Sequence, residues 1–266
     1  MRMLSNVPPA KRSGDLWYHF SGTYLSLRVG LFTLAFTMPF VLFLYGKFQH
    51  GIDLQPSMSA YFWAAVQDQC ASFPMRTIFV GYLSAIGVGL FAYKGLTNLE
   101  NFLLNAAALC AFAVAIFPQG LAVDDPWVAE LFKNCPAIRA WAEQPSFPVH
   151  YTAAVLLFVL LAIVSWFCAE KSLEYLPSDH DPATFRRVYK IIAVAMIVFP
   201  AVGYVVAFLL GALDYKIFFI EAAGVLTFGI YWAVKTGELK LSCLEKDPEA
   251  ALRHAMQRQM MEPPEE

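Results

Sequence analysis

Six apolar stretches constrain this chain more than any other feature of its sequence. They cover residues 29–48, 77–93, 101–117, 150–167, 191–210 and 217–234. A helix needs roughly 20 predominantly apolar residues to cross the hydrocarbon of a bilayer. Lipid offers no partner for free backbone N–H and C=O groups, so each stretch must be helical there. The sequence therefore predicts an all-α fold, a polytopic membrane helix bundle with six transmembrane helices.

Composition agrees with a membrane bundle and argues against a nucleic-acid partner. The chain is 58% hydrophobic and 15% charged, whereas soluble domains carry about 25% charged residues. Its net charge is −2, so it has no basic excess for nucleic acid. The apolar stretches lack the ligand spacings of a metal site, and no glycine-rich phosphate loop is present. We expect no metal, no cofactor and no nucleic-acid partner.

The distribution of Lys and Arg predicts that both termini lie in the cytoplasm. Taken together, basic residues are more numerous in the N-terminal segment, two alternate links and the C-terminal tail than in the other three links. Loops rich in Lys and Arg stay on the cytoplasmic side. This division gives a cytoplasmic or interfacial segment over residues 1–28, the six-helix domain over 29–237, and a cytoplasmic tail with a short helix over 238–266.

Three Asp-Pro pairs, at residues 125–126, 181–182 and 247–248, mark helix starts. Asp is a favourable N-cap, and Pro fits the first helical position because its missing N–H is not needed there. The pairs predict a short helix ending near Phe132, the start of the fifth spanning helix, and a tail helix over 250–261. Pro39 and Pro200 lie inside the first and fifth stretches, where they predict kinks.

Two of the five cysteines, Cys70 and Cys135, fall in the two links that the charge bias places outside the cytoplasm. In an oxidising compartment they could pair and join the two links. The alternative is two free thiols whose Cα atoms lie too far apart to bridge. We treat Cys70–Cys135 as a candidate disulfide.

Chemistry is expected where polar side chains meet the membrane, because ionisable groups inside spans are costly and mark functional sites. Glu221 lies about one turn into the sixth stretch, while Arg76 and His150 lie at the outer ends of the second and fourth. A serine-rich segment before Arg76 can reach the same level. Together these residues form the predicted outer polar cluster: Ser57, Ser59, Tyr61, Arg76, His150 and Glu221.

The outer polar cluster has three interpretations. Arg76 and Glu221 could form an ion pair that fixes helix packing, with His150 hydrated at the membrane interface. The cluster could instead be a pocket for a lipid head group or another amphiphile. A serine together with His150 and Glu221 would also supply the parts of a nucleophilic site, although no sequence spacing supports such a triad.

Several short segments resemble a group of uncharacterised bacterial six-span membrane proteins. The segments are PSMSAY at 56–61, RTIFVG at 76–81, YKG at 93–95, FFIE at 218–221, FGIYW at 228–232 and KTG at 235–237. Phe62 and Thr77 depart from the group, where Tyr and Asp are common. The layout is more distantly reminiscent of the DUF998 and Frag1/DRAM/Sfk1 six-span families.

This resemblance implies a six-span helical fold in a bacterial cytoplasmic (inner) membrane. The nearer group brings no activity with it. The distant families include proteins linked to lipid remodelling and membrane trafficking, which is an analogy at the level of the fold.

Three classes of function fit these observations. We favour a membrane protein without catalysis that binds a lipid or another membrane protein through the outer polar cluster. An intramembrane lipid-modifying hydrolase would need a nucleophile or metal that the sequence does not locate. A small-molecule transporter would need a polar site at the membrane midplane, and only Pro39 and Pro200 hint at broken helices.

Overall fold

The computed structural model describes residues 9–67, 70–121, 126–142, 148–242 and 247–261. Six helices of this part are long and apolar enough to cross a membrane, which confirms the predicted all-α, six-helix bundle. They are α1 (Pro9–His50), α2 (Pro74–Ala92), α3 (Asn98–Ile116), α6 (Val149–Ile163), α7 (Pro182–Leu209) and α8 (Lys216–Leu241). The described residues contain no β-strand. α6 continues into a π-helical turn, η3 (Val164–Cys168), and a 3-10 helix, η4 (Ala169–Tyr175).

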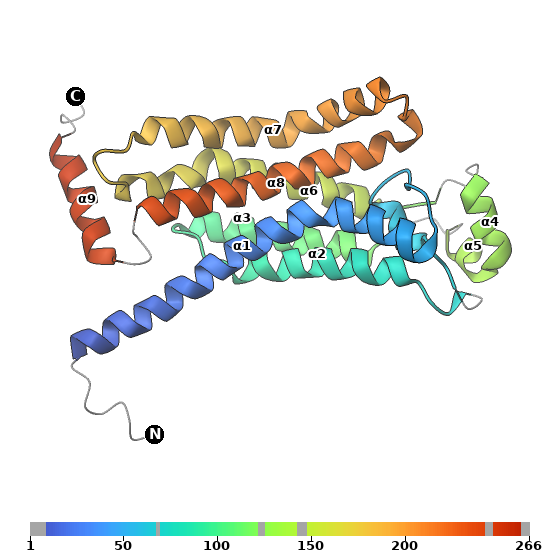
Figure 1. Ribbon diagram of the computed structural model, residues 1–266, viewed down its shortest axis with the longest axis horizontal. Helices are drawn as coiled ribbons and strands as arrows, with labels where there is room; N and C mark the ends of the chain where they lie inside the picture. Colours follow the sequence, from blue (N-terminus) through green and yellow to red (C-terminus); the bar gives the residue numbers. More distant parts are fainter. Residues whose placement is uncertain (1–8, 68–69, 122–125, 143–147, 243–246, 262–266) are drawn as a thin grey trace, which may run out of the picture.

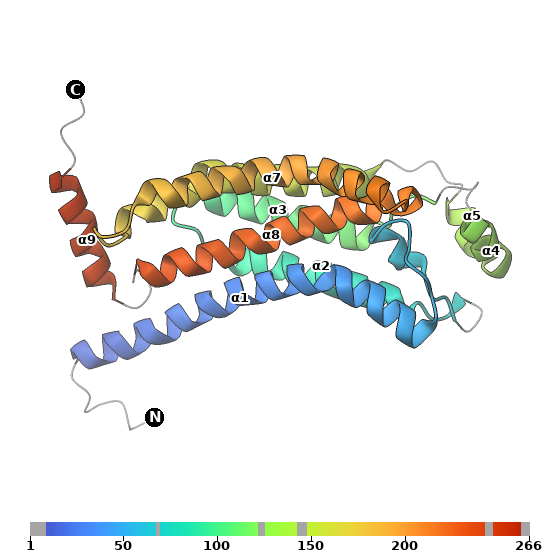
Figure 2. The same ribbon diagram turned by 45° about the horizontal axis from the view of Figure 1, so that its top comes forward.

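The spanning helices run alongside one another in one bundle (Figures 1 and 2), and their contacts close a ring. Each packs against its neighbours in the sequence, and α8 returns to pack against α1. The start of α1 and the tail helix α9 (Pro248–Met261) lie at one end of the bundle, which we call the terminal end. The short helices α4 (Pro126–Asn134) and α5 (Pro136–Ala142) lie at the opposite end. We call it the disulfide end, because Cys70 and Cys135 form a disulfide there. The charge bias predicts that the terminal end faces the cytoplasm.

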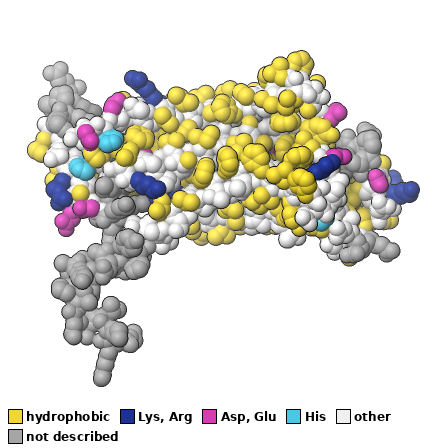
Figure 3. All heavy atoms as spheres, in the orientation of Figure 1, with side chains coloured by type: hydrophobic (Ala, Val, Ile, Leu, Met, Phe, Trp, Pro, Cys, Tyr) yellow, Lys and Arg dark blue, Asp and Glu magenta, His cyan; other side chains and the backbone are white. Residues whose placement is uncertain are grey.

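The outward surface is apolar over the middle of the bundle. Hydrophobic side chains cover the centre of the face shown in Figure 3, and charged side chains gather towards its two ends. Phe36 of α1, Leu109 of α3 and Phe208 of α7 are among the large apolar side chains that are more than 45% exposed. Exposed apolar surface on this scale is typical of contact with lipid.

Two of the three Asp-Pro pairs, at 181–182 and 247–248, start helices as predicted, whereas Asp125 of the third lies outside the described residues. The Asp181 carboxylate accepts the backbone N–H of Ala183 at 2.9 Å, and α7 begins at Pro182. Asp247 accepts the N–H of Ala250 at 2.9 Å before α9. α4 confirms the predicted short helix after residue 125. α1 starts well before residue 29 and α8 continues beyond residue 234, because the apolar stretches mark only the lipid-crossing parts of these helices.

Helices α7 and α8 approach closely at Gly203. A Cβ atom there would lie 2.5 Å from the carbonyl oxygen of Phe219 and 2.8 Å from the Cα of Ile220. Because backbone atoms cannot rotate away, Gly203→Ala must separate the two helices, and we expect a loss of about 1–3 kcal/mol. Thermal unfolding in detergent measures it. In the control Gly30→Ala, the new Cβ meets nothing within 4 Å; equal melting temperatures for the two variants would contradict the close approach.

A disulfide joins Cys70 to Cys135, with the two Cα atoms 5.9 Å apart. Cys70 belongs to the loop between α1 and α2, whereas Cys135 separates α4 from α5. The bond therefore ties two loops at the same end of the bundle.

We expect the intact mass, measured without reductant, to show the Cys70–Cys135 bridge, and Cys135→Ser to lower the free energy of unfolding by about 2–5 kcal/mol. A mass with all five thiols free would contradict the pairing.

Candidate functional site

Glu221 ties α8 to the loop between α1 and α2. It lies in the second turn of α8, at the disulfide end. Its Oε2 accepts the backbone N–H groups of Met58, at 2.6 Å, and Ser59, at 3.3 Å. Its Oε1 lies 3.0 Å from Ser59 Oγ. These donors stand at the start of the 3-10 helix η1 (Ser59–Trp63), where the first N–H groups have no partner within the helix.

His150 extends this contact into a chain of three side chains, Glu221–Ser59–His150, which we call the Glu221 cluster. His150 Nδ1 lies 2.7 Å from the carbonyl oxygen of Phe117, and Nε2 lies 2.9 Å from Ser59 Oγ. A carbonyl only accepts, so Nδ1 carries a hydrogen and donates it. Ser59 and His150 are each 4% exposed, so the chain is shielded from solvent.

The Glu221 cluster needs one extra proton to complete its hydrogen bonds. Ser59 has one hydroxyl hydrogen but faces two acceptors, Glu221 Oε1 and a neutral His150 Nε2. If Ser59 donates to His150, the Glu221 carboxyl must carry the proton and donate to Ser59. If Ser59 donates to Glu221, His150 must be the imidazolium. In either arrangement the charges of the three side chains sum to zero. A proton can pass between Glu221 and His150 through Ser59.

A pocket of about 700 Å³ opens beside Glu221, between α6, α7 and α8. We call it the α6–α7–α8 pocket. Its polar side chains are Ser57, Gln119, Tyr151 and Glu221, all at the disulfide end. The rest of its wall is apolar or glycine: Pro56, Gly120, Ala154, Val155, Phe158, Val159, Met196, Ile197, Pro200, Ile217 and Ile220. The volume lies within the range of about 300–1,000 Å³ that is typical of small-molecule sites.

A second hollow continues the pocket between α6 and α7 towards the terminal end. It measures about 420 Å³, and Val159 and Ile197 line both spaces. Trp166 and Phe167 lie at its far end. From Tyr151 to Phe167 the two spaces follow α6 and η3 for roughly 24 Å, at about 1.5 Å per residue. We call the pocket and the hollow together the groove. It has one polar end and is apolar along the rest of its length.

The predicted outer polar cluster assembles only in part. Ser59, His150 and Glu221 meet as described, and Ser57 lies beside them, donating from Oγ to Gln119 Oε1 at 2.8 Å. Tyr61 is fully buried against Phe218 instead of lining the pocket. Its burial raises the pKa of the Tyr61 hydroxyl to about 12.

The predicted ion pair between Arg76 and Glu221 is wrong. The Arg76 guanidinium carbon lies 4.2 Å from the ring centre of Phe62 and 3.8 Å from that of Phe73, and Nε donates to the Phe62 carbonyl at 3.2 Å. Glu221 and Arg76 instead contact opposite ends of η1. The carboxylate receives N–H groups at its start, and the guanidinium binds a carbonyl near its finish. Backbone polarity and aromatic faces replace the counter-charge that the sequence suggested for each group.

The order of groups differs from that of a nucleophilic triad. In such triads a histidine stands between the serine and the acid. Here Ser59 stands between Glu221 and His150, and the side chain that lines the pocket is Glu221. Ser59 is not part of the pocket wall. The arrangement is suited to holding or moving a proton at Glu221, not to serine attack on a bound ester.

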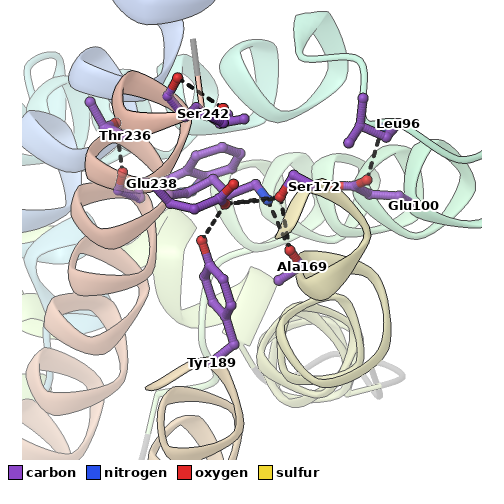
Figure 4. Close-up of polar contacts among 11 residues, drawn as sticks. Leu96, Glu100, Ala169, Ser172, Tyr189, Thr236, Glu238 and Ser242 are labelled. Carbon is purple, nitrogen blue, oxygen red and sulfur yellow. Dashed lines mark hydrogen bonds and ion pairs between the residues drawn. The ribbon is translucent and has the colours of Figure 1, made fainter. Parts of the chain in front are cut away.

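A second polar cluster lies near the terminal end and is fully buried (Figure 4). We call it the Lys235 cluster; it comprises Ser172, Tyr189 and Glu238, which Figure 4 labels, together with Lys235. The Lys235 ammonium donates to Glu238 Oε2 at 2.9 Å and also to Ser172 Oγ. The same Oε2 accepts the Tyr189 hydroxyl at 2.8 Å. All four side chains are at most 3% exposed, so the cluster joins α8 to α7 and η4 without solvent.

The Lys235 cluster was not predicted from the sequence. The sixth apolar stretch ends at residue 234, so Glu238 was expected in a cytoplasmic tail, although α8 continues to Leu241. Glu100 was overlooked for the same reason, since it precedes the third stretch; it is 2% exposed and accepts the N–H of Leu96 at 2.9 Å. One signal was available: Lys235 and Glu238 are three residues apart, on one face of a helix.

Within the described ranges, no three His, Cys, Asp or Glu side chains converge as metal ligands would. No protein-family model, no curated protein and no solved structure matches this chain significantly.

Proposed function

We propose that this integral membrane protein binds an amphiphilic lipid in the α6–α7–α8 pocket. The observation that carries the proposal is a pocket with polar groups at one end and apolar walls along the rest. An amphiphile has the same division, with a head group that needs hydrogen bonds and a chain that needs apolar surface. Glu221, Ser57 and Gln119 would meet the head group, and the hollow ending at Trp166 would take the chain.

The position of the pocket fits entry from the bilayer. Tyr151 and Val155 line it and are 52% and 63% exposed, on a face that is otherwise apolar. A chain could therefore enter sideways, without crossing an aqueous phase. With the termini in the cytoplasm, as the charge bias predicts, Glu221 would stand in the outer leaflet.

Binding is favoured over hydrolysis and transport. Hydrolysis of a lipid ester would need an accessible serine beside a general base. Ser59 lies outside the pocket wall, and Ser57, which lines it, donates its hydroxyl hydrogen to the amide oxygen of Gln119, which is not a base. Transport would need a polar site near the midplane, whereas the pocket's polar side chains are confined to the disulfide end. A role linked to lipids is what the resemblance to the distant six-span families implies.

Quenching of tryptophan fluorescence tests the proposal. The probe is a monoacylglycerol with a dibrominated chain, titrated into the detergent-solubilised protein; bromine quenches an indole that it touches. We expect saturable quenching, part of which disappears in Trp166→Phe, because Trp166 lines the chain end of the groove.

Two matched variants decide whether the quenching reports the pocket. Ala154→Phe fills the pocket wall and should weaken binding by about tenfold or more. Ala233→Phe adds the same ring to an exposed position of α8 outside both hollows and should bind normally. Quenching that does not saturate, or equal binding by the two variants, would overturn the proposal.

A further inference from the structure

The polar end of the α6–α7–α8 pocket carries an acidic side chain, Glu221, in a cluster whose summed charge is zero. Among the residues that the structure describes, Glu221 is the one carboxylic acid that lines the pocket, and no Lys or Arg lines it. Arg76 is engaged with aromatic rings and the Phe62 carbonyl. Phosphate and carboxylate head groups are recognised by Arg, Lys or clustered N–H donors. This wall offers no cation for them, and the N–H groups of Met58 and Ser59 are already bound to Glu221.

Glu221 retains the capacity to accept from a ligand. An ionised carboxylate offers about four lone-pair sites. Oε2 is used by Met58 and Ser59, while Oε1 is used once, by Ser59 Oγ. Glu221 is also partly exposed and lines the pocket. A donor in the pocket can therefore reach Oε1.

Two aromatic side chains, Tyr151 and Phe158, line the same pocket as Glu221. Gly224, one turn after Glu221 on α8, makes room for Phe158: a Cβ atom there would lie 2.9 Å from the end of the Phe158 ring. Aromatic faces within about 6 Å attract an ammonium group, more strongly when it is desolvated.

The geometry points to a cationic amphiphile as the ligand: we infer that the pocket binds a long-chain primary ammonium, with its N–H groups on Glu221 and its charge beside Tyr151 and Phe158. This inference rests on the proposed function and adds the chemistry of the head group. The Glu221 cluster suits it, because the proton on Glu221 can pass through Ser59 to His150. Glu221 is then an ionised carboxylate when it meets the ammonium, and the proton is held on His150.

A set of probes with one chain and three head groups tests the inference. Hexadecylammonium, hexadecanol and hexadecyl phosphate compete with the dibrominated monoacylglycerol for the full-length protein in a neutral detergent. We expect hexadecylammonium to bind about tenfold or more tightly than either of the others. In Glu221→Gln the advantage of the ammonium should disappear, whereas Glu174→Gln, at an exposed site on η4, should keep it.

A second variant covers the case in which Glu221→Gln does not fold. Phe158→Leu removes a ring without removing charge, and should reduce the advantage of the ammonium by roughly two- to fivefold. Equal or tighter binding of the alcohol or the phosphate would overturn the inference and leave the pocket assignment intact. If none of the three probes competes while the monoacylglycerol still binds, the inference is likewise overturned and the pocket assignment stands. Absence of saturable quenching would overturn both.

Discussion

Lys235→Met is expected to lower the free energy of unfolding by about 3–5 kcal/mol. Glu238 is fully buried, and Lys235 is the cation bound to its Oε2. Its Oε1 has no hydrogen-bond partner. Removing the ammonium leaves a buried carboxylate whose remaining donors in the described part of the chain are the hydroxyls of Ser172 and Tyr189. Equilibrium or thermal unfolding in detergent measures the loss.

Two further variants separate the charge pair from general effects on α8. Lys240→Met changes an exposed lysine of the same helix and should alter stability by less than about 0.5 kcal/mol. Lys235→Met combined with Glu238→Leu removes both charges and should cost clearly less than the two single changes added together. Additive costs would show that Lys235 and Glu238 do not depend on each other.

Glu221→Ala is expected to cost about 2–3 kcal/mol and to abolish binding in the pocket. The substitution leaves the N–H groups of Met58 and Ser59 without their acceptor, and an unmet buried donor costs about 1–3 kcal/mol. Glu221→Gln keeps an acceptor oxygen at the same place and should cost less than half as much. Melting temperatures of the two variants make the comparison; an alanine variant as stable as the glutamine variant would show that η1 is held by other contacts.

The six spans could be predicted because lipid imposes a strong rule on sequence. Each stretch had to be apolar along its length, and the Asp-Pro pairs at 181–182 and 247–248 added local signals that depend on nearby atoms only. The helix ends were less accessible. Inside a bundle, charged residues can be buried if they pair, so the hydropathy of residues 235–241 understated how far α8 runs.

The candidate site was predictable in its members but not in its contacts. Glu221 and His150 stood out because they are ionisable groups near span ends. Pairing Glu221 with Arg76 followed from charge alone, and it failed because η1 lies between them and offers backbone groups to both. The α6–α7–α8 pocket could not be derived at all, since it depends on which helices are neighbours in the ring and on the packing of Phe158 against Gly224.

Photocrosslinking tests the central claim, that an amphiphile occupies the groove along α6, α7 and α8. A hexadecylammonium probe with a diazirine near the chain end is irradiated with the protein, and the labelled peptides are identified by mass spectrometry. We predict adducts within residues 155–167 and 193–200, suppressed by excess unlabelled hexadecylammonium. Equal labelling of the exposed Phe102 and Leu109 on α3, or labelling that the competitor does not reduce, would contradict the claim.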